Sequence, residues 1–204
     1  MNKDKPVVIW LLSGCFLIFI MVVVGGITRI TDSGLSMVNW NLFMGAIPPL
    51  NKLEWQEVFS LYQQSPEGKK LNYNFTLSEF KYIYFWEYLH RMIGRLLGLV
   101  FIIPFFVFLI RKKLNNKLIK QCVILLLLGG MQGAIGWWMV KSGLIDNPHV
   151  SHYRLSIHLI IAFLTCAFTF WVALPLMYTK KINGNKKISR LLMIYFILVI
   201  IQII

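Results

Sequence analysis

The sequence predicts an all-α polytopic membrane protein, built as a four-helix transmembrane bundle followed by a cut-short fifth helix. Hydrophobic residues make up 57% of the 204 residues, and the mean hydropathy is +0.66. Soluble domains are roughly 45–50% apolar even when glycine is counted. The net charge of +13 does not indicate a nucleic-acid-binding protein. The basic residues form short clusters between long apolar runs, which is typical of the cytoplasmic loops of membrane proteins.

Four apolar segments are long enough to cross a bilayer, which takes about 20 helical residues. We expect them at about residues 7–26, 82–110, 118–140 and 153–178. A fifth apolar segment starts at Ile188 and reaches the last residue, Ile204, after roughly 17 residues, short for a span. We therefore expect a four-helix half at 1–187, the start of a second half at 188–204, and a chain that is a truncated part of a longer protein.

The basic residues also predict an orientation. They gather in the N-terminal tail and in the loops at 111–117 and 179–187, which share one side of the membrane if there are four complete spans. Short cytoplasmic loops carry an excess of Lys and Arg, so we expect a cytoplasmic N-terminus and an outer segment at 28–81. No cleavage site follows the first apolar run and no Arg- and Ser-rich transit peptide precedes it, which favours a bacterial inner membrane.

The outer segment at 28–81 is rich in aromatic residues and does not resemble a linker. Its stretch from Leu50 to Tyr62 places apolar residues at helical spacing, with Trp55, Phe59 and Tyr62 on one side. We expect short amphipathic helices here, lying at the membrane interface where Trp and Tyr are favoured.

The three cysteines, Cys15, Cys122 and Cys166, all lie within apolar runs. Their spacing fits neither a disulfide framework nor a zinc site. We interpret them as small buried apolar residues.

The second span carries the densest group of ionisable residues, namely Glu87, His90, Arg91 and Arg95. Such residues are costly within a membrane and are usually functional or paired. On a helix, Glu87 shares a face with both His90 and Arg91. Two interpretations stay open: a Glu87–Arg91 ion pair beside a hydrogen-bonded histidine, or a ligand histidine with an acid one turn away.

The fourth span carries Arg154 and His158 on one face. His90 and His158 lie about 12 Å and about 8 Å from the outer starts of their spans, at 1.5 Å per residue. Two histidines at similar depth could bracket a heme iron, although a buried histidine can equally be a satisfied polar group. Arginines near the interface suit heme propionates, which makes Arg91 and Arg154 candidates.

Two glycine pairs with GxxxG spacing, Gly94 with Gly98 and Gly129 with Gly133, either pack helices closely or make room for a porphyrin, and packing is favoured. The sequence assigns no role to a further set of basic residues: Arg29, Arg95, His149 and His152.

Five blocks of sequence together resemble heme A synthase, in the branch shared by alphaproteobacteria and mitochondria. The blocks lie at 25–31 (GGITRIT), 33–37 (SGLSM), 86–91 (WEYLHR), 132–144 (from Gln132-Gly133 through GWWMVKSGL) and 150–159 (VSHYRL followed by His158-Leu159). The resemblance covers essentially the whole chain, in order. The Glu-x-x-His-Arg element alone is short, but its combination with the other blocks is specific.

The resemblance implies half of an eight-helix pseudo-symmetric protein, with the substrate heme in this half and a heme b in the half that this chain lacks. It implies oxidation of the C8 methyl of heme O to a formyl group, giving heme A for terminal oxidases, with water as the oxygen source. It implies His90 and His158 as iron ligands and Glu87 as the residue beside the reacting methyl. The cysteine pair of the Bacillus-type branch is absent from the outer segment.

The resemblance implies heme O as the substrate, with heme O synthase and terminal oxidase assembly factors as candidate partners and a homo-oligomer as a candidate state. It leaves the electron acceptor and the activity of this chain alone open. A non-catalytic membrane cytochrome b would share the histidines but would not need Glu87. A transporter subunit with a polar path would need no heme.

Overall fold

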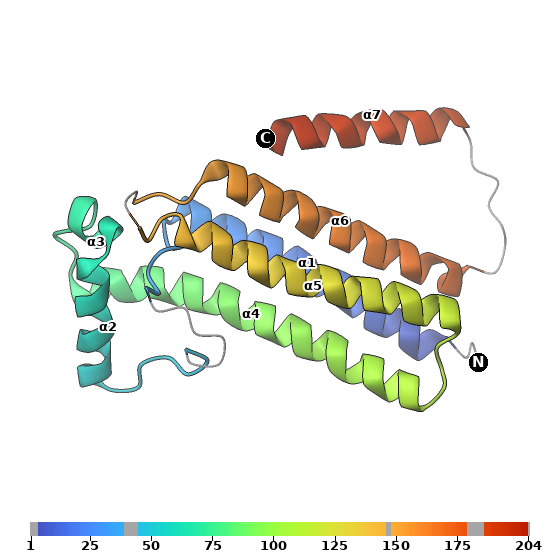
Figure 1. Ribbon diagram of the computed structural model, residues 1–204, viewed down its shortest axis with the longest axis horizontal. Coiled ribbons are helices and arrows are strands. Elements are labelled where there is room, and N and C mark those ends of the chain that lie inside the picture. Colours follow the sequence, from blue (N-terminus) through green and yellow to red (C-terminus); the bar gives the residue numbers. More distant parts are fainter. Residues whose placement is uncertain (1–3, 39–44, 146–147, 179–185, 204) are drawn as a thin grey trace.

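The computed structural model describes residues 4–38, 45–145, 148–178 and 186–203. These residues form helices and loops and contain no strand, as expected. Four helices are long and apolar enough to span a membrane. They are α1 (Lys5–Ile30), α4 (Leu77–Ile110), α5 (Asn116–Lys141) and α6 (His152–Met177), and they lie side by side as a bundle (Figure 1).

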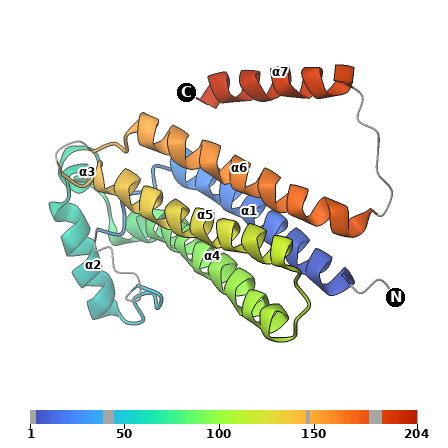
Figure 2. The same ribbon diagram turned by 45° about the vertical axis from the view of Figure 1, so that its right-hand side comes forward.

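The bundle has a ring arrangement in which each long helix packs against two others. Helix α1 packs against α4 and α6, and α5 packs against the same two helices. Helices α4 and α6 are therefore diagonal partners, as are α1 and α5. Figure 2 shows the same bundle from a second direction. The diagonal pair matters for function, because side chains that point inward from α4 and α6 face each other across the bundle interior.

The apolar core is tightest at the end of the bundle near the N-terminus. There Leu11 and Cys122 are fully buried among residues from all four helices. The indole N–H of Trp10 donates to the carbonyl oxygen of Val100 at 3.0 Å, which ties α1 to α4. The outward faces stay apolar but exposed, as at Phe16 (63%) and Leu127 (69%). Such faces suit a lipid environment, in which apolar side chains need no cover.

The other end of the bundle carries α2 (Lys52–Gln64) and α3 (Pro66–Lys70), and we call it the α2 end (Figure 1). Helix α2 lies where helical spacing is expected at 50–62. Its aromatic face packs on the start of α4, and Tyr62 and Phe80 are both fully buried there. Burial of large aromatic rings is the main stabilising contribution at this end.

Helices α4 and α5 start before the predicted spans because polar side chains cap their N-termini. Helix α4 begins at Leu77, five residues before the expected start of its span, since Thr76 and Glu79 form a reciprocal capping box. Helix α1 continues to Ile30. The fifth apolar segment forms α7 (Lys186–Ile203), which lies beside α6, and the Ser156 hydroxyl donates to the carbonyl oxygen of Ile203 at 2.7 Å. The division into halves at residue 187 stays a prediction.

Candidate functional site

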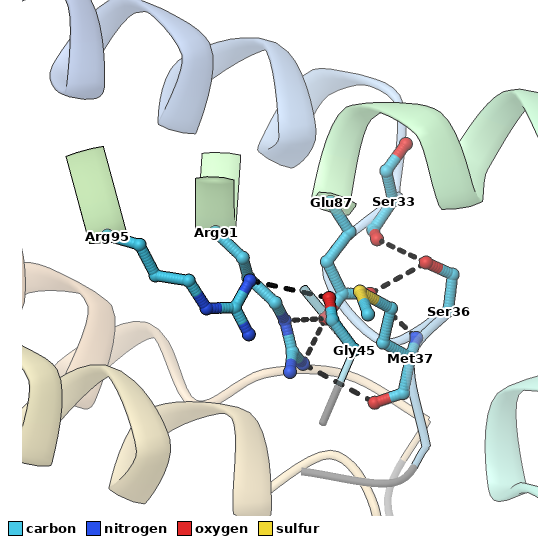
Figure 3. A network of polar contacts seen from close by, with 7 residues as sticks. All are labelled: Ser33, Ser36, Met37, Gly45, Glu87, Arg91 and Arg95. Carbon is cyan, nitrogen blue, oxygen red and sulfur yellow. Dashed lines mark hydrogen bonds and ion pairs between the residues drawn. The ribbon is translucent and has the colours of Figure 1, made fainter. Parts of the chain in front are cut away.

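The carboxylate of Glu87 is the centre of a buried polar network at the α2 end of α4 (Figure 3). Its Oε2 accepts hydrogen bonds from the Ser36 hydroxyl (2.7 Å) and from the backbone N–H of Met37 (2.8 Å). Its Oε1 accepts from Arg91, through Nε at 3.0 Å and Nη2 at 2.5 Å. The Glu87 side chain is only 5% exposed, so four donors satisfy a charge that water does not reach.

The structure therefore forms the Glu87–Arg91 ion pair that one of the two sequence interpretations expected. Arg91 also reaches the carbonyl oxygen of Met37 through Nη2 at 3.3 Å. The pair thus holds the segment after α1 against α4, using both a carboxylate and a guanidinium. An ion pair does not exclude a role for Glu87 beside a substrate, because the same contacts fix the carboxylate in place.

The segment at 33–37 also packs closely against the connection between α5 and α6. Leu35 is 2% exposed, and a Cβ added to Gly143 would lie only 2.6 Å from Leu35 Cδ1. Gly143 follows α5, so the segment spans from α4 to the α5–α6 connection. The chain path places it across the α2 end of the bundle. Ser36 and Met37 belong to a block that resembles the heme A synthase family, but their contact with Glu87 depends on the tertiary fold and no sequence signal revealed it.

His90 and His158 lie on the diagonal helices α4 and α6, and each packs against a glycine of a neighbouring helix. A Cβ added to Gly25 of α1 would lie 3.2 Å from His90 Nε2, and one added to Gly136 of α5 would lie 3.3 Å from His158 Cε1. The structure therefore places each histidine against a glycine of a neighbouring helix, one on each of the two diagonal helices. Their pairing as iron ligands stays a prediction.

The surroundings of the histidines fit an iron porphyrin. Nδ1 of His158 is buried and has no hydrogen-bond partner among the described residues. A buried imidazole nitrogen without a partner is unfavourable unless a ligand occupies it. Gln132 of α5 donates to the His158 carbonyl oxygen at 3.2 Å, which fixes the helix that carries this histidine. Imidazole is an established iron ligand, so His90 and His158 could hold heme between α4 and α6.

The two arginines proposed as propionate partners, Arg91 and Arg154, contact other groups of the protein. Arg91 is committed to Glu87. Arg154 donates to the Trp138 carbonyl oxygen at 2.7 Å, and its guanidinium lies 4.3 Å from the centre of the Trp138 ring. Arg95 contacts the Gly45 carbonyl oxygen through Nη1 at 3.4 Å. The roles of Arg91 and Arg154 toward a propionate remain predictions.

The structure agrees with the interpretation of the cysteines as unpaired residues but differs from the packing expected of one glycine pair. The thiols of Cys15 and Cys166 each lie 3.8 Å from the other residue's carbonyl oxygen, so two of the three cysteines are neighbours across α1 and α6. Both are free thiols. In α5, Gly129 and Gly133 are exposed, and an added Cβ would meet no atom within 4 Å. This pair therefore packs no helix among the described residues.

Known proteins resemble this chain over most of its length. Residues 8–204 match the COX15-CtaA family, described as cytochrome oxidase assembly protein. A protein of Flavobacterium psychrophilum named heme A synthase is 56% identical over 206 residues, which cover 100% of this chain and 61% of that protein.

Proteins of the same name from Flavobacterium johnsoniae and Nitrosospira multiformis are 56% and 53% identical, over 91% and 93% of this chain and 54% and 53% of their own lengths. The chain thus spans about half to three-fifths of the length of these curated relatives. No solved structure matches. The chain belongs to the COX15-CtaA family of cytochrome oxidase assembly proteins.

Proposed function

We propose that this chain is the four-helix, substrate-binding half of a heme A synthase, which oxidises the C8 methyl group of heme O to a formyl group. The observation that carries the proposal is the diagonal placement of His90 and His158, each packed on a glycine, in a chain whose relatives bear that name. Heme O is the substrate, and its iron would be bracketed by the two imidazoles.

The role of the two histidines is to bind and orient. The two imidazoles would hold and orient the porphyrin, so that its reacting edge would meet the protein at one fixed place. Gly25 and Gly136 leave room for this, because larger residues would press on the imidazole rings.

The role of Glu87 is electrostatic. Its carboxylate lies one helical turn from His90 and could stabilise positive charge that develops at the methyl carbon during oxidation. Both of its oxygens already accept hydrogen bonds, two each. These four hydrogen bonds hold the carboxylate in one position on α4, one turn from His90.

The rest of the proposal concerns the protein's setting. Water supplies the oxygen atom, and an acceptor outside the described residues takes the electrons. We place the protein in a bacterial inner membrane with its N-terminus in the cytoplasm, working with heme O synthase and with terminal oxidase assembly factors. The longer relatives leave space for a second half, to which we assign a heme b.

The test is analysis of the heme bound to the protein purified from cells that also make heme O. We expect a Soret band, and pyridine hemochrome spectra that show conversion of heme O to heme A. A non-catalytic cytochrome b would bind heme and convert none of it, and a transporter subunit would show no Soret band. Either result would contradict the proposal.

A further inference from the structure

Two contacts define how α1 and α4 are aligned along the line where they pack together, which we call the α1–α4 seam. A Cβ added to Gly94 would lie 3.4 Å from Met21 Cε, and one added to Gly25 would lie 3.2 Å from His90 Nε2. From the first contact to the second, each helix moves four residues toward the α2 end, forward along α1 and backward along α4. Residues four apart share a helix face. The next step along the same faces therefore places Arg29 of α1 opposite Trp86 of α4.

Trp86 carries an unsatisfied donor. Its indole nitrogen Nε1 is buried and has no hydrogen-bond partner among the described residues. Tryptophan can only donate through this atom, so the partner that it needs is an acceptor. Trp86 lies one turn from His90 on the same face of α4, about 6 Å along the helix axis. A molecule bound at His90 could extend to this donor.

Arg29 supplies a charge at the same end of the seam. Its side chain is 55% exposed and its guanidinium meets Asp32 at 3.4 Å, and the Asp32 side chain is itself 71% exposed. Exposed pairs of this kind are weak and exchange partners readily. By contrast, Arg91 is committed to Glu87, and Arg154 to the carbonyl oxygen and ring of Trp138. Arg29 is thus the arginine of this region that is freest to turn toward an incoming anion.

We propose that the Trp86 indole N–H and the Arg29 guanidinium form a carboxylate site at the α2 end of the α1–α4 seam, which takes one propionate of the porphyrin held by His90 and His158. The proposal rests on the proposed function, because it assumes a porphyrin at the two histidines. A guanidinium and an indole N–H together give charge-assisted hydrogen bonds to the carboxylate, and the indole donor gains the acceptor that it lacks.

The experiment compares two porphyrins that differ only in the propionates. Ferric protoporphyrin IX and its dimethyl ester are titrated into the purified protein in nanodiscs, with the Soret band as the signal. We expect the wild type to bind the free acid more tightly than the ester. Trp86→Phe and Arg29→Gln should each weaken free-acid binding by roughly tenfold or more, since a hydrogen bond to a charged group is lost. Neither variant should change ester binding.

Two control variants test whether the effect is local. Trp171 is 54% exposed on α6 and Arg111 is exposed at the far end of α4. Trp171→Phe and Arg111→Gln should leave both affinities unchanged. Arg29→Lys should restore part of the free-acid affinity, because it keeps the charge but not the fork of donors.

The outcomes separate the possible failures. If the Soret band of added ferric protoporphyrin IX does not change on titration into the wild type, the proposed function itself is contradicted. Equal wild-type affinity for acid and ester, or equal loss of both in Trp86→Phe and Arg29→Gln, would overturn the carboxylate site alone. If Trp86→Phe does not fold, the exposed Arg29 variant still decides the question. If a lipid phosphate is the partner of Arg29, the acid and the ester should bind equally well. Adding anionic lipid to neutral nanodiscs should then change the stability of the wild type but not that of Arg29→Gln. This result would also overturn the proposal.

Discussion

The Ser36 hydroxyl donates a hydrogen bond to Oε2 of Glu87 at 2.7 Å, across 51 positions of sequence. This hydrogen bond and the one from the Met37 backbone N–H join the segment after α1 to helix α4 at Glu87. The Glu87 carboxylate therefore contributes two separable properties, its negative charge and the position of its hydrogen-bond acceptor oxygens. Substitutions can remove one and keep the other.

Glu87→Gln keeps the shape and removes the charge. The amide oxygen can still accept from Ser36 and Met37, and Arg91 keeps its hydrogen bond to the Met37 carbonyl oxygen. We expect heme to stay bound per folded molecule, while heme O or its partly oxidised alcohol accumulates, because the charge that favours oxidation is gone. Extraction and chromatography of the bound heme measure this. Wild-type amounts of heme A on the variant would contradict a catalytic Glu87, and a parallel fall of folded yield and heme content would assign it to the ion pair alone.

Ser36→Ala is the matched control for that experiment. It removes one neutral donor and leaves the Met37 N–H and the Arg91 contacts in place. We expect a loss of about 2 kcal/mol in stability, typical of one hydrogen bond to a charged group, and retained production of heme A.

His90→Ala and His158→Ala should leave the helices inserted and remove heme from this half of the protein. The reason is that the proposed site takes one imidazole from each of the two diagonal helices, so neither can replace the other. Absorbance spectra of the purified variants measure the bound heme. If both variants keep the wild-type spectrum and full turnover, the ligand assignment is wrong.

Much of the fold could be predicted from the sequence, because apolar length alone identifies a membrane span. The ends of the helices could not, since α4 starts at a capping box that lies in polar sequence before its span. Distance from a helix start is for this reason a poor measure of depth, and the pairing of His90 with His158 depends instead on the diagonal placement of their helices.

The site was predictable where partners lie on one helix. Glu87 and Arg91 are four residues apart, so their pairing follows from helical spacing. The Ser36 and Met37 contacts depend on the path of a loop, and one of the donors is a backbone N–H, which every residue type except proline has. Cys15 and Cys166 lie 151 positions apart, and only helix packing brings them together.

Glu67 should make the α2–α3 region less stable as the pH rises. Burial raises its pKa to about 7, with Glu87 and Asp32 adding to the effect, although the hydrogen bond from the Tyr62 hydroxyl acts in the opposite direction. The folded state therefore binds a proton more tightly than the unfolded state, whose value is 4.5. The contribution of Glu67 to stability is therefore highest below pH 4.5, falls between that value and about 7, and then levels off, with a total change of roughly 3 kcal/mol.

Hydrogen exchange measures this effect. Protection factors for residues 52–70, corrected for the intrinsic rate at each pH, should fall between pH 5 and pH 7. Glu67→Gln should abolish the slope, since an amide does not titrate. Protection that rises with pH in the wild type would contradict the assigned pKa direction.

Reporter fusions should place the N-terminus and the loops at 111–117 and 179–187 in the cytoplasm. These segments are rich in Lys and Arg, which are enriched in the short cytoplasmic loops of membrane proteins. A fusion at Lys113 is the most informative, because it lies between α4 and α5 and far from the α2 end. A fusion at Lys70 on α3 serves as the control and should report the opposite side. An external signal at Lys113 would overturn the topology.

Adding a single methyl group at Gly25 or Gly136 should disturb the histidine site, while the same change nearby should not. In Gly25→Ala the new Cβ would lie 3.2 Å from His90 Nε2, tighter than ordinary van der Waals contact, so the imidazole must shift. In Gly136→Ala the new Cβ would meet His158 Cε1 at 3.3 Å. We expect both variants to bind ferric porphyrin more weakly and with a shifted Soret band, because the ligand nitrogen leaves its position.

Gly26→Ala and Gly133→Ala are the matched controls, one on each of the same two helices. An added Cβ at either position meets no atom within 4 Å, so the change in helix propensity is the same but the histidines are untouched. These controls should bind porphyrin as the wild type does and be as stable or slightly more so, since alanine favours a helix over glycine. A normal spectrum in both Gly25→Ala and Gly136→Ala would mean that the imidazoles do not use the space beside these glycines. An equal loss in tests and controls would trace the effect to helix packing and not to the iron ligands.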